Sequence, residues 1–162
     1  MKQFLELIPP GGLQDYILDM SARTEFAPLF ESQLGYGHVS QCAHGASASG
    51  LVGGSIACFD FERDFYPYPS AHFKAIICCE IWETLAHDPI HMLEEIHRIL
   101  RPGCHLVFTT RRLPAGRVAE VLEGCGLEIT ALEADGDRVY ASARKIGPVR
   151  ERYPAWLYPE RA

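Results

Sequence analysis

Two glutamates directly follow the most apolar stretch of the chain and are its first candidates for chemistry. Residues 75–79 (AIICC) are typical of a central parallel strand buried on both faces, and Glu80 and Glu83 come immediately after it. In open α/β sheets, ligands bind at the carboxyl ends of the strands. One of these carboxylates can therefore act as a base toward a substrate hydroxyl. The alternative is that they are helix-start carboxylates, which the helix dipole stabilises without any ligand.

The histidines and cysteines do not predict a metal or redox site. His87 and His91 have the i,i+4 spacing of helical metal ligands, but Asp88 between them is an expected helix N-cap, so their imidazoles need not share a helix face. No convincing third ligand accompanies them, and we expect no metal site. The cysteines form no CxxC pair and most lie in apolar stretches, which favours buried, reduced thiols and a cytoplasmic protein. They are Cys42, Cys58, Cys78, Cys79, Cys104 and Cys125.

Alternating strands and helices must position these side chains. The hydrophobic pattern predicts helices at residues 3–8, 25–34, 88–100 and 118–122, with Thr24 as the N-cap of the second. It predicts strands at residues 16–18, 38–42, 56–61, 75–79, 106–110, 128–132 and 138–143. Residues 44–55 and 62–72 are expected loops, and Asp135 with Gly136 signals a hairpin. This order predicts an α/β fold whose mostly parallel sheet ends in an antiparallel hairpin and carries helices on both faces.

The composition and net charge of the chain bear on which classes of partner it binds. The chain has 162 residues, 48% of them hydrophobic and 22% charged, which is the balance of one soluble globular domain. The formal net charge of −6 offers no general attraction to nucleic acid or to an anionic membrane. We therefore expect neither as a partner.

The region around the central strand carries an ordered set of residues found in a known family. The segment FYPYPSAHFKAIICCEIWETLAHDPIHMLEEIHRILRPGCHLVFTT has a proline-rich loop, an apolar strand, a helix that ends before Pro-Gly and a strand that ends in Thr. This order resembles the second half of class I S-adenosylmethionine-dependent methyltransferases. The matching residues are Phe73, Glu80, Glu83, Asp88, Pro89, Glu95, Ile96, Arg98, Leu100, Pro102, Gly103, Thr109 and Thr110.

The resemblance carries implications for fold, cofactor and site. It implies a Rossmann-like methyltransferase domain over residues 1–146, followed by a tail over residues 147–162. It implies transfer of a methyl group from S-adenosyl-L-methionine to a small-molecule acceptor, an in-line displacement that depends chiefly on proximity. The cofactor contacts that it assigns are Asp19, Met20, Ser21, Asp60, Phe61, Cys79, Glu80 and Ile81.

The sequence departs from the family where the cofactor would bind. The family follows its first strand with an acidic residue and a loop of three glycines, whereas this chain keeps Asp19 but has Ser21, Arg23 and Glu25 at the glycine positions. A side chain at a left-handed position costs about 1–2 kcal/mol. The second predicted strand also ends without the family's carboxylate for the ribose hydroxyls, and losing such a bond costs about 1.5–3 kcal/mol. The sequence therefore predicts weak cofactor binding or none.

Individual residues near the site keep two interpretations each. Asp19 either contacts the cofactor's amino group or caps the turn after its strand. The acidic residues Asp60, Glu62 and Asp64 either face a sulfonium or are solvated charges on a loop. The orientation of Arg23 discriminates between cofactor binding and its loss. If its side chain points into the cofactor position, it would repel the cationic sulfonium. If it points to solvent, it would leave that position free.

Two functions remain open from the sequence. The first is an active methyltransferase with an unusual loop. The second, which the missing glycines favour, is a scaffold that has lost its cofactor and binds a protein partner. A homodimer is a further alternative, because the aromatic tail residues Tyr153, Trp156 and Tyr158 can cover a sheet edge or a neighbouring chain.

Overall fold

One sheet organises the molecule. The computed structural model describes residues 2–21, 23, 25–45, 56–148 and 153–157. Within them, seven strands pair in the order β3-β2-β1-β4-β5-β7-β6. Strands β1 to β5 run parallel, whereas β7 is antiparallel to both β5 and β6. The predicted fold class is thus confirmed. The strands are β1 Tyr16–Asp19, β2 His38–His44, β3 Ile56–Phe59, β4 Phe73–Cys79, β5 Leu100–Thr110, β6 Leu127–Asp135 and β7 Arg138–Lys145.

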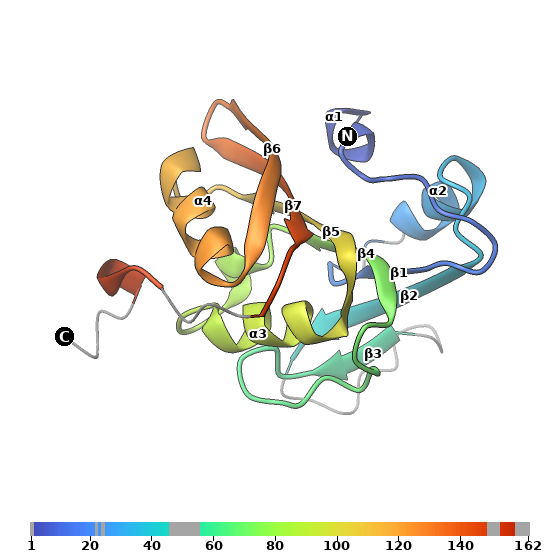
Figure 1. The fold of residues 1–162 in the computed structure, drawn as a ribbon, viewed down its shortest axis with the longest axis horizontal. Coiled ribbons are helices and arrows are strands. Elements are labelled where there is room, and N and C mark those ends of the chain that lie inside the picture. The colour runs from blue at the N-terminus through green and yellow to red at the C-terminus, as the bar shows by residue number, and fades with distance from the viewer. Residues whose placement is uncertain (1, 22, 24, 46–55, 149–152, 158–162) are drawn as a thin grey trace.

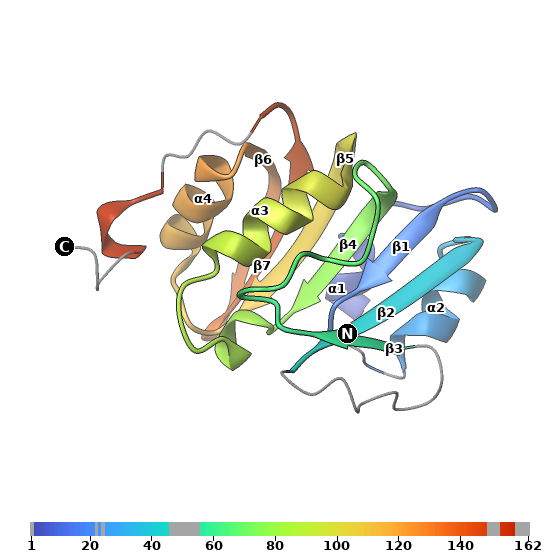
Figure 2. The same ribbon diagram turned by 90° about the horizontal axis from the view of Figure 1, so that it is seen from below.

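Helices cover both faces of the sheet, as predicted. Helices α1 (Lys2–Glu6) and α2 (Phe26–Ser32) lie on one face, and α3 (Ile90–Ile99) and α4 (Ala115–Gly124) lie on the other (Figures 1 and 2). Two 3₁₀ turns, η1 (Trp82–Thr84) and η2 (Ala155–Leu157), complete the described elements. No helix among the described residues is both long and apolar enough to cross a membrane. Thr24, the predicted cap of α2, lies outside the described residues.

The boundaries of two elements differ from the prediction. The N-cap of α3 is Pro89 and not Asp88, although the Asp88 carboxylate accepts a hydrogen bond from the Ile90 amide at 3.0 Å. Strand β5 begins directly after α3, at Leu100, because the chain turns extended there and pairs with Phe73 before the register shifts. The predicted stop signal after α3 therefore lies inside β5.

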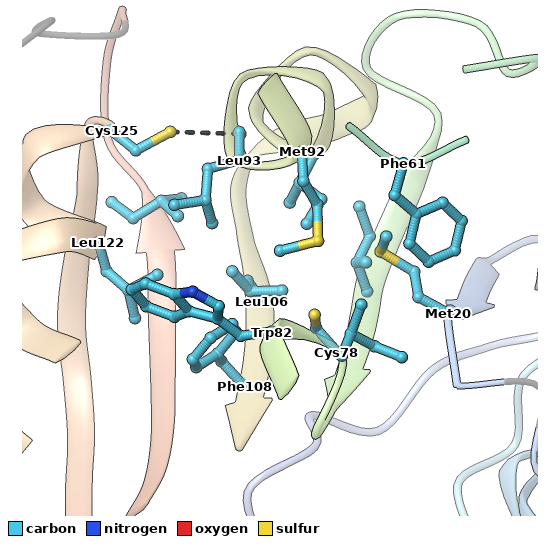
Figure 3. Packing of buried hydrophobic residues seen from close by; sticks show 14 of the residues in the cluster. Met20, Phe61, Cys78, Trp82, Met92, Leu93, Leu106, Phe108, Leu122 and Cys125 are labelled. Carbon is cyan, nitrogen blue, oxygen red and sulfur yellow. Dashed lines mark hydrogen bonds between the residues drawn. The ribbon is translucent and has the colours of Figure 1, made fainter. Parts of the chain in front are cut away.

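Alternation along the central strand divides the core in two. Ile76 and Cys78 of β4 join the cluster beneath α3 and α4, whereas Ala75 and Ile77 join the cluster beneath α1 and α2. All four side chains are fully buried. Burying an aliphatic side chain of this size stabilises a fold by about 1.5–3 kcal/mol, so β4 is anchored on both faces. Figure 3 shows the first cluster, with Cys78 among side chains from α3, α4, η1 and β5.

The loop over residues 60–72 covers the sheet beside α3. Its Phe61 and Tyr66 rings are fully buried in the same cluster as α3. Arg98 of α3 holds the loop backbone, donating to the Tyr66 carbonyl at 3.1 Å and to the Tyr68 carbonyl at 2.9 Å. Residues 60–72 thus cover the sheet as a loop rather than as a helix, and they lead directly into β4.

Candidate functional site

Asp19 is the last residue of β1, and its carboxylate is fully buried. One oxygen accepts hydrogen bonds from the Ser21 amide (2.9 Å) and hydroxyl, and the other accepts one from the Gln41 side-chain amide at 3.0 Å. Burial raises the pKa of Asp19, and the hydrogen bonds from Ser21 and Gln41 oppose that rise. One oxygen therefore caps the turn after β1, and the other is held by the neighbouring strand β2.

Gln41 is a site residue that the sequence did not reveal. It lies opposite Asp19 in the register of β1 and β2, and its side-chain nitrogen donates both to Asp19 and to the Arg23 carbonyl, each at 3.0 Å. The sequence holds no signal for it, because β2 (HVSQCAH) carries several polar residues and nothing local distinguishes Gln41 from the others. Gln41 ties the turn after β1 to the neighbouring strand.

Arg23 extends from the turn after β1 to the end of β4. Its guanidinium lies 3.4 Å from the Glu80 carboxylate and 5.7 Å from the centre of the Phe26 ring. Strands β1 and β4 are the neighbours at which the strand order reverses, and ligands of open α/β sheets bind at this point. The Arg23 side chain therefore lies across the edge between β1 and β4, against Glu80, although 41% of it remains exposed.

Glu80 is held by two more arginines. Its carboxylate lies 3.1 Å from Nε of Arg111 and 2.7 Å from the guanidinium of Arg138. Its backbone has a φ of +56°, a left-handed conformation that costs a residue other than glycine about 1–2 kcal/mol. Sequence reasoning identified Glu80 but missed Arg138, because β7 reaches this edge only through the antiparallel hairpin.

The other residues beside Glu80 are occupied by local contacts. Glu83 accepts hydrogen bonds from the Thr110 hydroxyl and, at 2.6 Å, from the Arg111 amide, so it fastens η1 to the end of β5. The Cys79 thiol accepts a hydrogen bond from Thr109 at 3.4 Å, and burial raises its pKa. Ile81 is buried in the core. Glu83 is therefore positioned as a structural carboxylate.

The predicted contacts after β3 also organise their own loop. Asp60 accepts a hydrogen bond from the Glu62 amide at 2.9 Å, and its own amide donates to Asp64 at 2.8 Å. The side chains of Met20 and Phe61 are fully buried, and they lie close together in the core rather than at the surface (Figure 3). The acidic residues thus have the partners of a folded loop.

His44, Asp60 and Glu62 have ligand atoms within 4.8 Å of one another, a grouping that the sequence did not suggest. The Phe61 amide donates to Nδ1 of His44 at 3.0 Å, which leaves the imidazole proton on Nε2, 3.8 Å from Glu62. Glu62 itself accepts hydrogen bonds from the backbone amides of residues 86 and 87 at 3.0 and 2.6 Å. Nδ1 of His44 and both carboxylate oxygens of Glu62 therefore each accept a hydrogen bond from a backbone amide.

Comparison with known proteins shows which family part of the chain is similar to. Residues 35–108 match the family described as a methyltransferase domain. No curated protein matches the sequence. The fold resembles a chain in the complex between the Haloferax volcanii Trm112 methyltransferase activator and its putative methyltransferase (16% identity, 90% of this chain and 88% of that chain, TM-score 0.69).

Two further solved structures share the fold. They are S-adenosylmethionine-dependent methyltransferases from Mesorhizobium loti (14% identity, 88% of this chain and 96% of that chain, TM-score 0.69) and from Aquifex aeolicus (17% identity, 90% and 88%, TM-score 0.62). The resemblance that the sequence predicted to class I S-adenosylmethionine-dependent methyltransferases is confirmed.

Proposed function

We propose that this chain, which has the fold of the class I methyltransferases, keeps their scaffold without their cofactor and acts as a binding module for a protein partner. The observation that carries this proposal is the pair between Arg23 and Glu80, 3.4 Å apart, at the point where strands β1 and β4 diverge. A guanidinium there opposes a cationic sulfonium. The proposal extends to a cytoplasmic location, which the free cysteines support.

The groups that would have to hold the cofactor already have other partners. Both oxygens of Asp19 accept hydrogen bonds from Ser21 and Gln41. Gln41 stands opposite Asp19 on β2, and its amide nitrogen is used by Asp19 and by Arg23. Micromolar affinity corresponds to about −8 kcal/mol, and losing about 3–4 kcal/mol of charged hydrogen bonds would leave affinity near millimolar. The residues present therefore do not fit S-adenosyl-L-methionine.

A protein partner has a precedent among chains of this fold. The Haloferax volcanii chain with the same fold was solved in complex with the Trm112 methyltransferase activator. From that structure we carry over to this chain only the kind of role, which is a methyltransferase scaffold bound by another protein. A second copy of this chain is the other partner that we consider.

The alternative is an active methyltransferase acting on a small-molecule acceptor. It is favoured by the family match over residues 35–108, which includes Glu80 and its strained backbone. In that case the arginine of the turn must move aside when the cofactor binds.

Calorimetry separates the two functions. The purified protein is titrated with S-adenosylmethionine and S-adenosylhomocysteine up to millimolar concentration, with a class I methyltransferase that binds both as the positive control. We expect no saturable heat. Binding in the micromolar range would overturn the proposal and direct the search to methyl acceptors.

A further inference from the structure

Several arginines converge on one carboxylate at the carboxyl edge of the sheet. Three arginines from different parts of the chain converge on Glu80: Arg23 after β1, Arg111 after β5 and Arg138 at the start of β7. We call these three residues the arginine cluster. Three guanidinium groups thus share a single carboxylate as their direct ion-pair partner.

The nearby carboxylates of Asp19 and Glu83 make no direct ion pair with the cluster among the described residues. Asp19 is fully buried and receives its hydrogen bonds from Ser21 and Gln41. Glu83 is engaged by the Thr110 hydroxyl and by the backbone amide of Arg111, not by a guanidinium. Among the described residues, the ion pairs of the cluster are therefore those with Glu80.

The arginine cluster also has more N–H donors than the Glu80 carboxylate can accept. Each guanidinium carries five N–H donors in a planar fork that matches the oxygens of a carboxylate or a phosphate. The distances to Glu80 are 2.7 Å for Arg138, 3.1 Å for Arg111 and 3.4 Å for Arg23. Arg23 is the loosest of the three and is 41% exposed, so it can turn toward an incoming anion at the smallest loss.

The backbone of Glu80 is strained to hold its carboxylate in this position. A residue other than glycine with a φ of +56° at the end of a central strand is uncommon, and such residues cluster at ligand sites. All three guanidinium groups lie within reach of this one carboxylate. The cluster therefore has the dimensions of a site for a single small anionic group rather than for an extended acidic surface.

We propose that the arginine cluster binds the carboxylate or phosphate group of a small anionic ligand, with Glu80 as the internal counter-ion that orients the guanidinium groups. This inference rests on the proposed function, because the ligand would take the edge of the sheet that the cofactor occupies in active relatives. Glu80 does not itself contact the ligand, and its carboxylate competes with the ligand's anionic group for the same N–H donors.

Anion titrations at constant ionic strength test the proposal. Binding of inorganic phosphate and of malonate is measured by calorimetry and by thermal unfolding, with chloride as the screening control. We expect at least one of the two anions to bind saturably, and which one binds tells a phosphate ligand from a carboxylate ligand. Arg138→Gln should weaken that binding about tenfold, since it removes a charge-assisted hydrogen bond. Arg144→Gln is the matched control on the same strand, because Arg144 pairs only with exposed Glu128, and it should leave binding unchanged.

Glu80→Gln gives a test of opposite sign. Removing the internal carboxylate should strengthen anion binding several-fold, and the bound anion should restore thermal stability that the substitution removes. A purely structural ion-pair network predicts loss of stability with no saturable response to anions in either protein, and that result would overturn the inference. Micromolar binding of S-adenosylmethionine alongside phosphate binding would instead overturn the proposed function and leave the cluster's chemistry standing.

Discussion

At the scale of single residues, Asp19 is a buried carboxylate whose hydrogen bonds hold the end of β1 to the turn that follows and to β2. Its carboxylate is buried at the end of β1, and burial raises its pKa above the ordinary value of 3.8. A raised pKa means that the folded state holds the proton more tightly than the unfolded state. The ionised carboxylate therefore costs stability at neutral pH, and this cost is relieved as the pH falls through the raised pKa.

Asp19→Asn should reveal that linkage. Relative to this variant, the free energy of unfolding of the unaltered protein should increase as the pH is lowered from about 7 to about 4.5. Urea unfolding at the two pH values measures the difference. Asp15→Asn provides the contrast, because the hydrogen bond from Lys74 lowers the pKa of Asp15, so its stabilisation is lost only below the ordinary value of 3.8. A difference for Asp19→Asn that does not change with pH would contradict this account.

The sequence predicted only some of the residues of the candidate site. It pointed to Glu80 because this residue follows the apolar central strand, and to Asp19 through the family resemblance. It could not point to Gln41 or Arg138, since their contacts depend on the register of β2 and on the hairpin that returns β7 to the sheet. Long-range pairing of this kind leaves no local pattern in a single sequence.

At the scale of elements, an ion pair on α3 is one of the anchors of the loop over residues 60–72. Arg98 donates to the Glu95 carboxylate at 2.6 Å, and Glu95 in turn accepts a hydrogen bond from the Tyr66 amide at 3.3 Å. Glu95 is 8% exposed, so its charge is compensated almost entirely by Arg98. The pair fixes the loop to α3 and thereby sets the approach to β4.

Arg98→Met should therefore destabilise the protein by about 3 kcal/mol, because it leaves a buried carboxylate and two loop carbonyls without their donor. Chemical unfolding measures the loss. The control is Arg144→Met, which breaks a pair between two half-exposed side chains and should cost no more than about 1 kcal/mol. Equal losses in the two variants would show that the loop is held by its aromatic side chains alone.

The elements themselves were largely predictable. The helix after Asp88 and the strand before Glu80 were confirmed, because amphipathic spacing and a continuous apolar run are strong signals. The predicted start of β5 was too late. Pro102 and Gly103 were interpreted as the end of the preceding helix, but they lie inside β5, where its pairing with β4 shifts register. Local turn signals could not tell these two uses apart.

At the scale of the whole molecule, the C-terminal segment is tied to the domain. Leu157 is 4% exposed and belongs to the main hydrophobic cluster. Trp156 donates to Glu120 of α4 at 3.0 Å, and Arg117 lies 4.8 Å from its ring. We expect the described part of the tail to contribute to folding stability rather than to wait for a partner.

Leu157→Ala tests this expectation. Removing a buried leucine side chain should lower the free energy of unfolding by about 2–3 kcal/mol. Ile146→Ala is the matched control, because that side chain is 47% exposed and its loss should stay within about 0.5 kcal/mol. A negligible effect of Leu157→Ala would mean that the segment is dispensable for the fold.

The central claim is that the chain's own side chains take the position of the cofactor. The most direct measurement is a nuclear magnetic resonance titration with S-adenosylhomocysteine, following the backbone amides of Ser21, Phe61 and Ile81 around that position. The account predicts no saturable shift of these amides up to millimolar ligand. Saturating shifts of all three at micromolar concentrations would show that the cofactor still binds and would contradict it.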